Sequence, residues 1–166
     1  MNFRQIIIIA ICCLFITNGY AQILNIGDTQ TANLILRSNK NYKLIYIFCN
    51  YCQASKNRFS KVAEFGLNNN IESYFICAQD SFEVADYIDT CKIKPTMYMI
   101  NQNRKRKLIS FYNPIKATCK FLKKHFNINV SKMGASDFFI LDKNNKIIKQ
   151  SNWEMKDEEY FLLLEE

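Results

Sequence analysis

The chain of 166 residues contains few of the residues that usually interrupt a fold or bind a metal ion. It has two prolines, four glycines and one histidine, His125. So few prolines and glycines exclude a Pro/Gly-rich linker, and the sequence contains no low-complexity tract or internal repeat. A single histidine and the lack of a second C-x-x-C pair argue against a zinc site, which needs four such ligands.

The apolar run near the N-terminus, residues 6–16, is too short to span a bilayer comfortably. It follows a positive charge at Arg4 and precedes small residues that end at Ala21. This order of charged, apolar and small segments predicts a secretory signal peptide over residues 1–21, cleaved near Ala21.

A lipid anchor at Cys12 and an uncleaved membrane anchor are the alternatives to cleavage. After cleavage, residues 22–166 are expected to form a single domain with its own core. We therefore expect an exported protein in the periplasm or another extracytoplasmic compartment.

The formal net charge of +7 is spread along the sequence, and its densest basic cluster is residues 104–107. One interpretation is a patch that binds nucleic acid. The other is a solvated hairpin tip between two strands, residues 96–100 and 107–112. We favour the second because an exported protein rarely meets nucleic acid, so no nucleic-acid partner is expected.

Removal of the signal peptide would leave an odd number of cysteines, which is a poor basis for a static disulfide framework. It is better explained by one reactive pair together with thiols that are buried as small apolar groups. We expect the cysteines within a strand and within a helix, Cys77 and Cys119, to be inert core thiols. The five cysteines are Cys49, Cys52, Cys77, Cys91 and Cys119.

Two apolar runs, residues 42–48 and 71–79, predict strands that are buried on both faces. A helical pattern precedes the first run and another separates the two, which requires parallel strands joined by crossover helices. Residues 137–142 and 146–150 predict an antiparallel hairpin near the C-terminus. The expected fold class is an α/β sandwich with a mixed central β-sheet flanked by helices.

Local signals also predict where helices begin and end. Asp28 is expected to cap the first helix, and Gly66 is expected to end the helix that follows the cysteine pair. Pro114 is expected to open a later helix, and a final helix is expected to include Trp153.

The pair Cys49 and Cys52 lies where a buried strand gives way to a helix. Free backbone N–H groups and the positive end of the helix dipole at that point are expected to lower the pKa of the Cys49 thiol. Cys52 would lie one turn further on. We expect Cys49 to be the more exposed, attacking thiol and Cys52 to be the buried thiol that resolves the mixed disulfide.

Two other interpretations of the pair remain. Two structural cysteines or a static disulfide would carry out no exchange. A copper site is also conceivable, with both cysteines and His125 as ligands, although a histidine near a helix C-terminus is usually a surface or capping residue. The methionines that could complete such a site are Met97, Met99 and Met133.

The strand over residues 43–48, the motif Cys49-Asn50-Tyr51-Cys52 and the helix after it resemble the thioredoxin superfamily. The hairpin "DFFILDKNNKIIKQ" is similar to the end of the exported bacterial TlpA/ResA-like thiol–disulfide oxidoreductases. The resemblance implies a thioredoxin-like fold and a redox-active pair, with Cys49 and Cys52 catalytic, that acts on dithiols or disulfides of proteins in cell redox homeostasis. It also implies a membrane electron donor for a reductase. We expect a monomer without a cofactor or a bound metal.

The resemblance can be aligned in two registers, which differ in the residue at the cis-proline position that faces the cysteines. A minimal thioredoxin would place Pro95 there, whereas the TlpA/ResA-like register, which uses every element and which we prefer, places Ser136 there. The chain departs from the family elsewhere: Phe48 replaces the usual tryptophan, and the buried strand carries Lys43 and no carboxylate to accept a proton from Cys52. A thioredoxin-fold binding protein without turnover and a copper chaperone on the same fold are the alternative functions.

Overall fold

The computed structural model describes residues 22–79, 81–100 and 113–165. The expected signal peptide, the basic cluster at 104–107 and the strand expected at 107–112 lie outside these residues. Among the residues described, no helix has the length and apolar character needed to cross a membrane.

The described strands form one six-stranded sheet in the order β1-β4-β3-β2-β5-β6. The first four strands in that order run parallel, and β5 and β6 are antiparallel to their neighbours. The strands are β1 (Ile23–Leu24), β2 (Tyr42–Phe48), β3 (Glu72–Cys77), β4 (Met97–Met99), β5 (Phe138–Asp142) and β6 (Ile147–Gln150).

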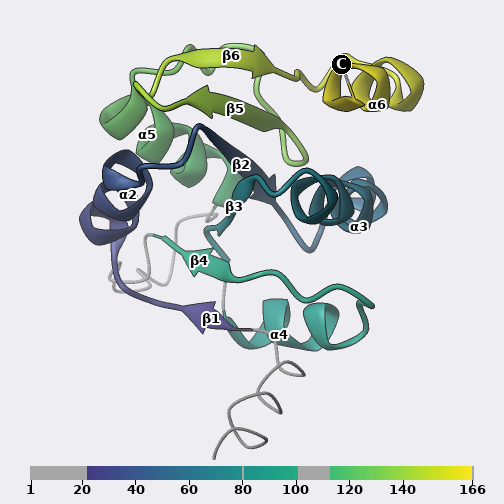
Figure 1. Cartoon of the computed structure of the whole chain (residues 1–166). Coiled ribbons are helices and arrows are strands. Elements are labelled where there is room, and N and C mark those ends of the chain that lie inside the picture. Colours follow the sequence, from purple (N-terminus) through teal and green to yellow (C-terminus); the bar gives the residue numbers. More distant parts are fainter. Residues whose placement is uncertain (1–21, 80, 101–112, 166) are drawn as a thin grey trace, which may run out of the picture.

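Helices cover both faces of the sheet (Figure 1). Helices α3, α4 and α6 pack on one face, and α2 and α5 pack on the other. This arrangement confirms the predicted α/β sandwich with a mixed central sheet flanked by helices. The helices are α2 (Asp28–Arg37), α3 (Gln53–Asn68), α4 (Ser81–Asp89), α5 (Pro114–Phe126) and α6 (Asp157–Glu165).

The central strand β2 directs alternate side chains into two cores. Tyr46 and Phe48 lie in the core under α3, whereas Ile45 and Ile47 lie in the core under α2 and α5. The ring of Phe59 on α3 packs edge-on against Phe48, with centroids 5.0 Å apart. This packing fixes the beginning of α3 against the strand that carries the cysteine pair.

Two predicted helix boundaries were wrong. Gly27, at φ 84°, is the residue before α2, so Asp28 is the first residue of that helix rather than its cap. Gly66 does not end α3, which continues to Asn68. A Cβ atom on Gly66 would overlap with Ser73 Oγ, so this glycine allows the close approach of α3 to β3 instead.

The predicted final helix is present as α6, but it begins at Asp157, so the inclusion of Trp153, which lies in the turn before it, was wrong. Pro114, in contrast, is the first residue of α5, and the side chain of Asn113 accepts a hydrogen bond from the Lys116 N–H. The proline prediction is therefore confirmed.

Candidate active site: the cysteine pair and the segment beside it

Both cysteines of the motif lie at the carboxyl end of β2. Cys49 directly follows β2, and Cys52 is the residue before α3. The Cys52 N–H donates to the Cys49 carbonyl at 3.0 Å, which closes a turn between the two residues. Such a turn holds its end Cα atoms within about 7 Å, close to the span that a disulfide bridges. Both cysteines are free thiols here.

The first anchor of this turn is Ser55 in α3. Its hydroxyl accepts a hydrogen bond from the Cys49 N–H at 3.0 Å. Its carbonyl accepts a second from the Tyr46 hydroxyl at 2.7 Å. Because Ser55 and Tyr46 are fully buried, these contacts hold the turn to the core beneath it.

The second anchor lies at the junction of β3 and α4. The Asn50 N–H donates to Gln79 Oε1 at 2.5 Å, and the Asn50 side-chain amide donates to the Glu83 carbonyl at 3.0 Å. Asn50 therefore contacts the segment of β3 and α4 directly. Tyr51, the other residue between the two cysteines, is 69% exposed.

The order of exposure is the reverse of the prediction. Cys49 is only 5% exposed, whereas Cys52 is half-buried. The reason is that Cys49 lies directly after the buried strand, with its N–H bound to Ser55, whereas Cys52 lies at the N-cap of the next helix.

The predicted fall in the pKa of the Cys49 thiol was also wrong. Burial raises the pKa of Cys49, and this effect outweighs the lowering by hydrogen bonds from the backbone N–H groups of Tyr51 and Cys52. Helix α3 begins at Gln53, so Cys52 and not Cys49 occupies the N-cap position where the dipole acts most strongly.

The raised pKa predicts how fast Cys49 reacts at different pH values. Because only the thiolate is a nucleophile, alkylation of Cys49 by iodoacetamide should speed up about tenfold per pH unit from pH 7 to 9, without levelling off. Mass spectrometry of the peptide that contains Cys49 measures this rate. A plateau below pH 8 would instead mean that the thiolate is stabilised in the resting protein.

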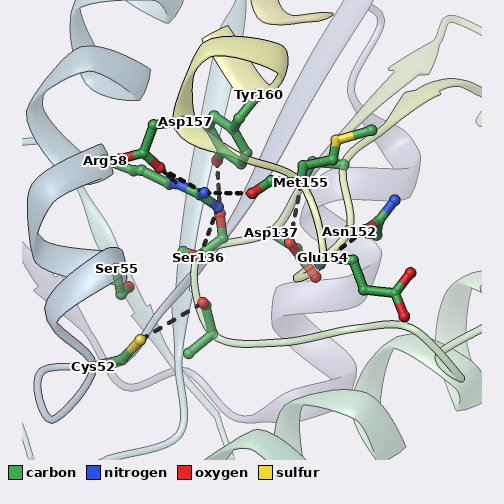
Figure 2. A network of polar contacts seen from close by, with 12 residues as sticks. Cys52, Ser55, Arg58, Ser136, Asp137, Asn152, Glu154, Met155, Asp157 and Tyr160 are labelled. Atoms are coloured by element: carbon green, nitrogen blue, oxygen red, sulfur yellow. Dashed lines mark hydrogen bonds and ion pairs between the residues drawn. The ribbon is translucent and has the colours of Figure 1, made fainter.

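Ser136 lies in the segment that faces Cys52 (Figure 2). The residue before it, Ala135, has its carbonyl oxygen 3.9 Å from Cys52 Sγ. The N–H of Ser136 donates to the Ile47 carbonyl at 2.9 Å, so Ser136 lies against the last residues of β2.

Pro95 lies at the opposite end of the sheet. It precedes β4, which runs parallel to β3 and β2, so it is near the amino ends of these strands. Cys49 follows the carboxyl end of β2. The structure therefore brings Ser136, and not Pro95, together with the pair. No cis peptide bond occurs among the described residues.

Three residues of this region were not identified from the sequence: Arg58, Asp137 and Tyr160. The Arg58 side chain donates to Ser136 Oγ at 3.2 Å, and the Tyr160 hydroxyl donates to the Ser136 carbonyl at 2.6 Å. For Arg58, the sequence offers one indication of burial: it is next to Phe59, which lies on the buried side of α3.

A buried carboxylate follows Ser136 directly in the chain, at Asp137. Asp137 is fully buried, and its carboxylate accepts hydrogen bonds from the Gly134 N–H at 2.7 Å and the Ser151 hydroxyl at 3.2 Å. Burial raises the pKa of Asp137 to about 6, against the lowering effects of these hydrogen bonds and of the Arg58 charge.

None of the remaining cysteines belongs to the motif, but Cys77 lies next to it. Its thiol donates to Gln79 Oε1 at 3.6 Å, the same atom that accepts from the Asn50 N–H. Cys77 is fully buried in the core under α3, as predicted, and burial raises its pKa to about 12. Cys119 was predicted to be a core thiol but is only half-buried, as is Cys91. Burial also raises the pKa of Cys119.

His125 lies at the end of α5, and its ring packs 5.1 Å from the ring of Phe121. Helix α5 covers the other face of the sheet from α3, so the copper set of Cys49, Cys52 and His125 is not brought together. Met97 and Met99 are fully buried in the core. Across the part of the chain that the structure describes, no group of three or more His, Cys, Asp or Glu residues could hold a metal ion.

No protein-family pattern matches the chain, and no curated protein matches its sequence. Several solved structures are similar in outline. A putative protein disulfide isomerase from Bacteroides thetaiotaomicron is 9% identical with a TM-score of 0.48, and the match covers 75% of this chain and 70% of that one.

A secreted Mycobacterium tuberculosis disulfide oxidoreductase, described as homologous to E. coli DsbE, is 7% identical with a TM-score of 0.47, over 75% of this chain and 81% of that one. Mycobacterium tuberculosis AhpC is 13% identical with a TM-score of 0.44, over 76% of this chain and 73% of that one. Likenesses this distant carry no conclusion about activity, so the proposals for this chain depend on its own residues.

Proposed function

We propose that this chain is a thiol–disulfide oxidoreductase that exchanges disulfides with protein substrates through Cys49 and Cys52. The observation that carries the proposal is the closed turn at the end of β2, in which Cys52 N–H donates to Cys49 O at 3.0 Å. Such a turn holds its end Cα atoms within about 7 Å, close to the span of one disulfide, and both residues are free thiols.

The surroundings of the two sulfur atoms support different roles for them. The backbone N–H groups of Tyr51 and Cys52 act to lower the pKa of the Cys49 thiol, as donors near a thiolate do. The thiol of Cys52 instead faces the Ala135 carbonyl, which can accept a hydrogen bond only from a protonated thiol. We therefore assign Cys49 as the attacking residue and Cys52 as the resolving residue.

Each step of the exchange conserves its electrons. The Cys49 thiolate attacks one sulfur of a substrate disulfide, forms a mixed disulfide and releases the other substrate sulfur as a thiolate, which takes a proton from solvent. Cys52 then loses its proton and attacks the Cys49 sulfur, which releases the second substrate thiol. The pair is oxidised by two electrons and the substrate disulfide is reduced by two. The reverse sequence oxidises a substrate dithiol.

We also propose that the chain is exported after loss of residues 1–21. The mature residues 22–166 then act as a single-domain monomer. In that setting a reductase needs a fresh supply of electrons for every turnover. We propose a membrane electron donor that reduces the Cys49–Cys52 disulfide, and we propose Ser136 as the residue that lies opposite the pair when a substrate binds.

A thioredoxin-like binding protein without turnover is the second candidate. It is favoured by the burial of Cys49, which is 5% exposed and has a raised pKa. A buried thiol with a raised pKa reacts slowly with disulfides at neutral pH.

Reduction of insulin disulfides by dithiothreitol separates the two candidates. The wild-type chain should accelerate the reaction, and the double variant Cys49→Ser/Cys52→Ser should lose at least about 100-fold of that acceleration, since both reacting groups are gone. The turbidity of the released insulin chains measures the rate, and Cys119→Ser is the control. Equal rates for the wild-type chain and the double variant would favour the binding protein.

A further inference from the structure

Ser136 has an unusual backbone conformation. Its φ is 98°, in a region that residues with a side chain rarely adopt. Apart from glycine, the other described residues with positive φ are asparagines, which tolerate such values more easily: Asn70, Asn127 and Asn145. A strained residue persists only where its surroundings fix it, and such residues are concentrated at functional sites.

Three hydrogen bonds fix Ser136, and each uses a different group of the residue. Its N–H donates to the Ile47 carbonyl at 2.9 Å, its carbonyl accepts from the Tyr160 hydroxyl at 2.6 Å, and its hydroxyl accepts from Arg58 Nη1 at 3.2 Å. The donors Arg58 and Tyr160 come from α3 and α6, so both helices are tied to this one residue (Figure 2).

Arg58 is itself held on several sides. Its guanidinium donates to the Asp157 carboxylate, with Nη2 at 2.6 Å, and to the Met155 carbonyl at 3.0 Å. It also lies over the ring of Tyr160, 4.0 Å from the centroid, with its side chain only 6% exposed. A buried, planar donor with this many partners is a rigid support rather than a surface charge.

The conformation of Ser136 also fixes the group that faces Cys52. The N–H of a trans peptide points away from its C=O. Because the Ser136 N–H points to Ile47, the Ala135 carbonyl of the same peptide points the other way, where it lies 3.9 Å from Cys52 Sγ. The hydrogen bonds that fix Ser136 therefore determine which group the Cys52 thiol contacts.

We infer that Arg58 and Tyr160 are positioning residues, which hold the Ala135–Ser136 peptide against Cys52 and so keep its thiol aligned for attack on a mixed disulfide at Cys49. This inference rests on the proposed exchange reaction. Without the support, Ser136 can relax, the Ala135 carbonyl can turn, and the Cys52 thiol can adopt other rotamers. Misalignment slows an intramolecular step even where the reacting groups are intact.

Oxidised glutathione gives a direct test, because its two steps on the reduced chain are separable. Attack by Cys49 forms a Cys49–glutathione disulfide and releases one glutathione thiol. Attack by Cys52 then forms the Cys49–Cys52 disulfide and releases the second. Acid quenching at successive times, followed by mass spectrometry of the Cys49 peptide, measures the formation and the decay of the adduct.

We expect Arg58→Met to slow the decay of the adduct about tenfold and Tyr160→Phe about fivefold, the scale of one or two lost hydrogen bonds. Adduct formation should stay within about twofold, because it uses Cys49 alone. Arg58→Lys should restore part of the decay rate. Lys61→Met is the matched control, since Lys61 also joins α3 to α6, over the ring of Phe161 at 4.0 Å, without contacting Ser136.

A second measurement concerns the strain itself. Glycine adopts a φ of 98° without steric penalty. In a Ser136→Gly background, Tyr160→Phe should therefore reduce the folding equilibrium constant about fivefold more than it does in the wild-type background, where relaxation of the strained Ser136 offsets part of the loss. Equal effects in both backgrounds would overturn the claim that Tyr160 holds a strained residue.

The outcomes of the kinetic test are distinct. Wild-type decay rates in folded Tyr160→Phe and Arg58→Met, or formation and decay slowed alike, would overturn the inference and leave the proposed function standing. A wild-type chain that never forms the Cys49–Cys52 disulfide would overturn the proposed function, and with it the role of these residues.

Discussion

A chain carrying Cys52→Ser is expected to trap a mixed disulfide at Cys49 that lasts at least about 100 times longer than in the wild-type chain. The reason is that Cys52 attacks within the same molecule, where a positioned group acts at an effective concentration far above that of any free thiol. Serine at position 52 cannot take part in disulfide exchange, so the adduct must wait for a thiol from solution.

The measurement is the intact mass of the protein after a short exposure to oxidised glutathione, followed by dilution and acid quenching at successive times. Cys119→Ser is the control, because Cys119 is half-buried on α5, away from the pair. Its adduct at Cys49 should disappear at the wild-type rate.

The reciprocal variant, Cys49→Ser, decides between the two orders of attack. Cys52 is the more exposed of the two thiols, and a long-lived adduct at Cys52 in this variant would reverse the assigned roles. Adducts at neither position, in either variant, would contradict exchange chemistry at this site.

The free energy of unfolding is expected to fall by about 3 kcal/mol between pH 3 and pH 7 because of Asp137 alone. Its pKa in the folded chain is about 6, against an ordinary value of 3.8, and each pKa unit corresponds to about 1.4 kcal/mol. Near pH 5 the folded chain holds a proton that the unfolded chain has released. Raising the pH through this window therefore destabilises the fold.

Urea denaturation of the wild-type chain and of Asp137→Asn at several pH values measures this effect. The difference between the two free energies of unfolding should change by about 3 kcal/mol across the window, whatever the other carboxylates contribute. Asp86→Asn, which removes an exposed carboxylate of α4, is the control and should run parallel to the wild-type chain. A constant difference between the wild-type chain and Asp137→Asn would mean that the buried carboxyl titrates normally.

The sequence was sufficient for those features that depend on local pattern. The strand β2 was predicted over its full length, because an unbroken run of β-branched and aromatic residues is typical of a strand buried on both faces. The hairpin of β5 and β6 followed from two runs around a polar turn, and the position of the pair between β2 and α3 followed from the same kind of pattern. Each of these features is determined by residues that are close together in the sequence.

The features that were missed depend on contacts between distant residues. Arg58 and Ser136 are 78 residues apart, and the buried amine of Lys43 bonds to Asn145 across 102 residues. The order of exposure of the two thiols was also missed, because it depends on whether α3 begins at Cys49 or at Gln53. No periodic pattern marks that difference.

The contacts of Arg58 with Met155 and Asp157 have a consequence for the order in which the protein is made. A chain leaves the ribosome from its N-terminus onward. Cys49 and Cys52 therefore emerge long before the residues that fix Ser136, with most of the chain between them. A chain still being synthesised carries both thiols without the contacts that fix Ser136. Under the proposed reaction, the second step of exchange would therefore become efficient only once the C-terminal helix has docked.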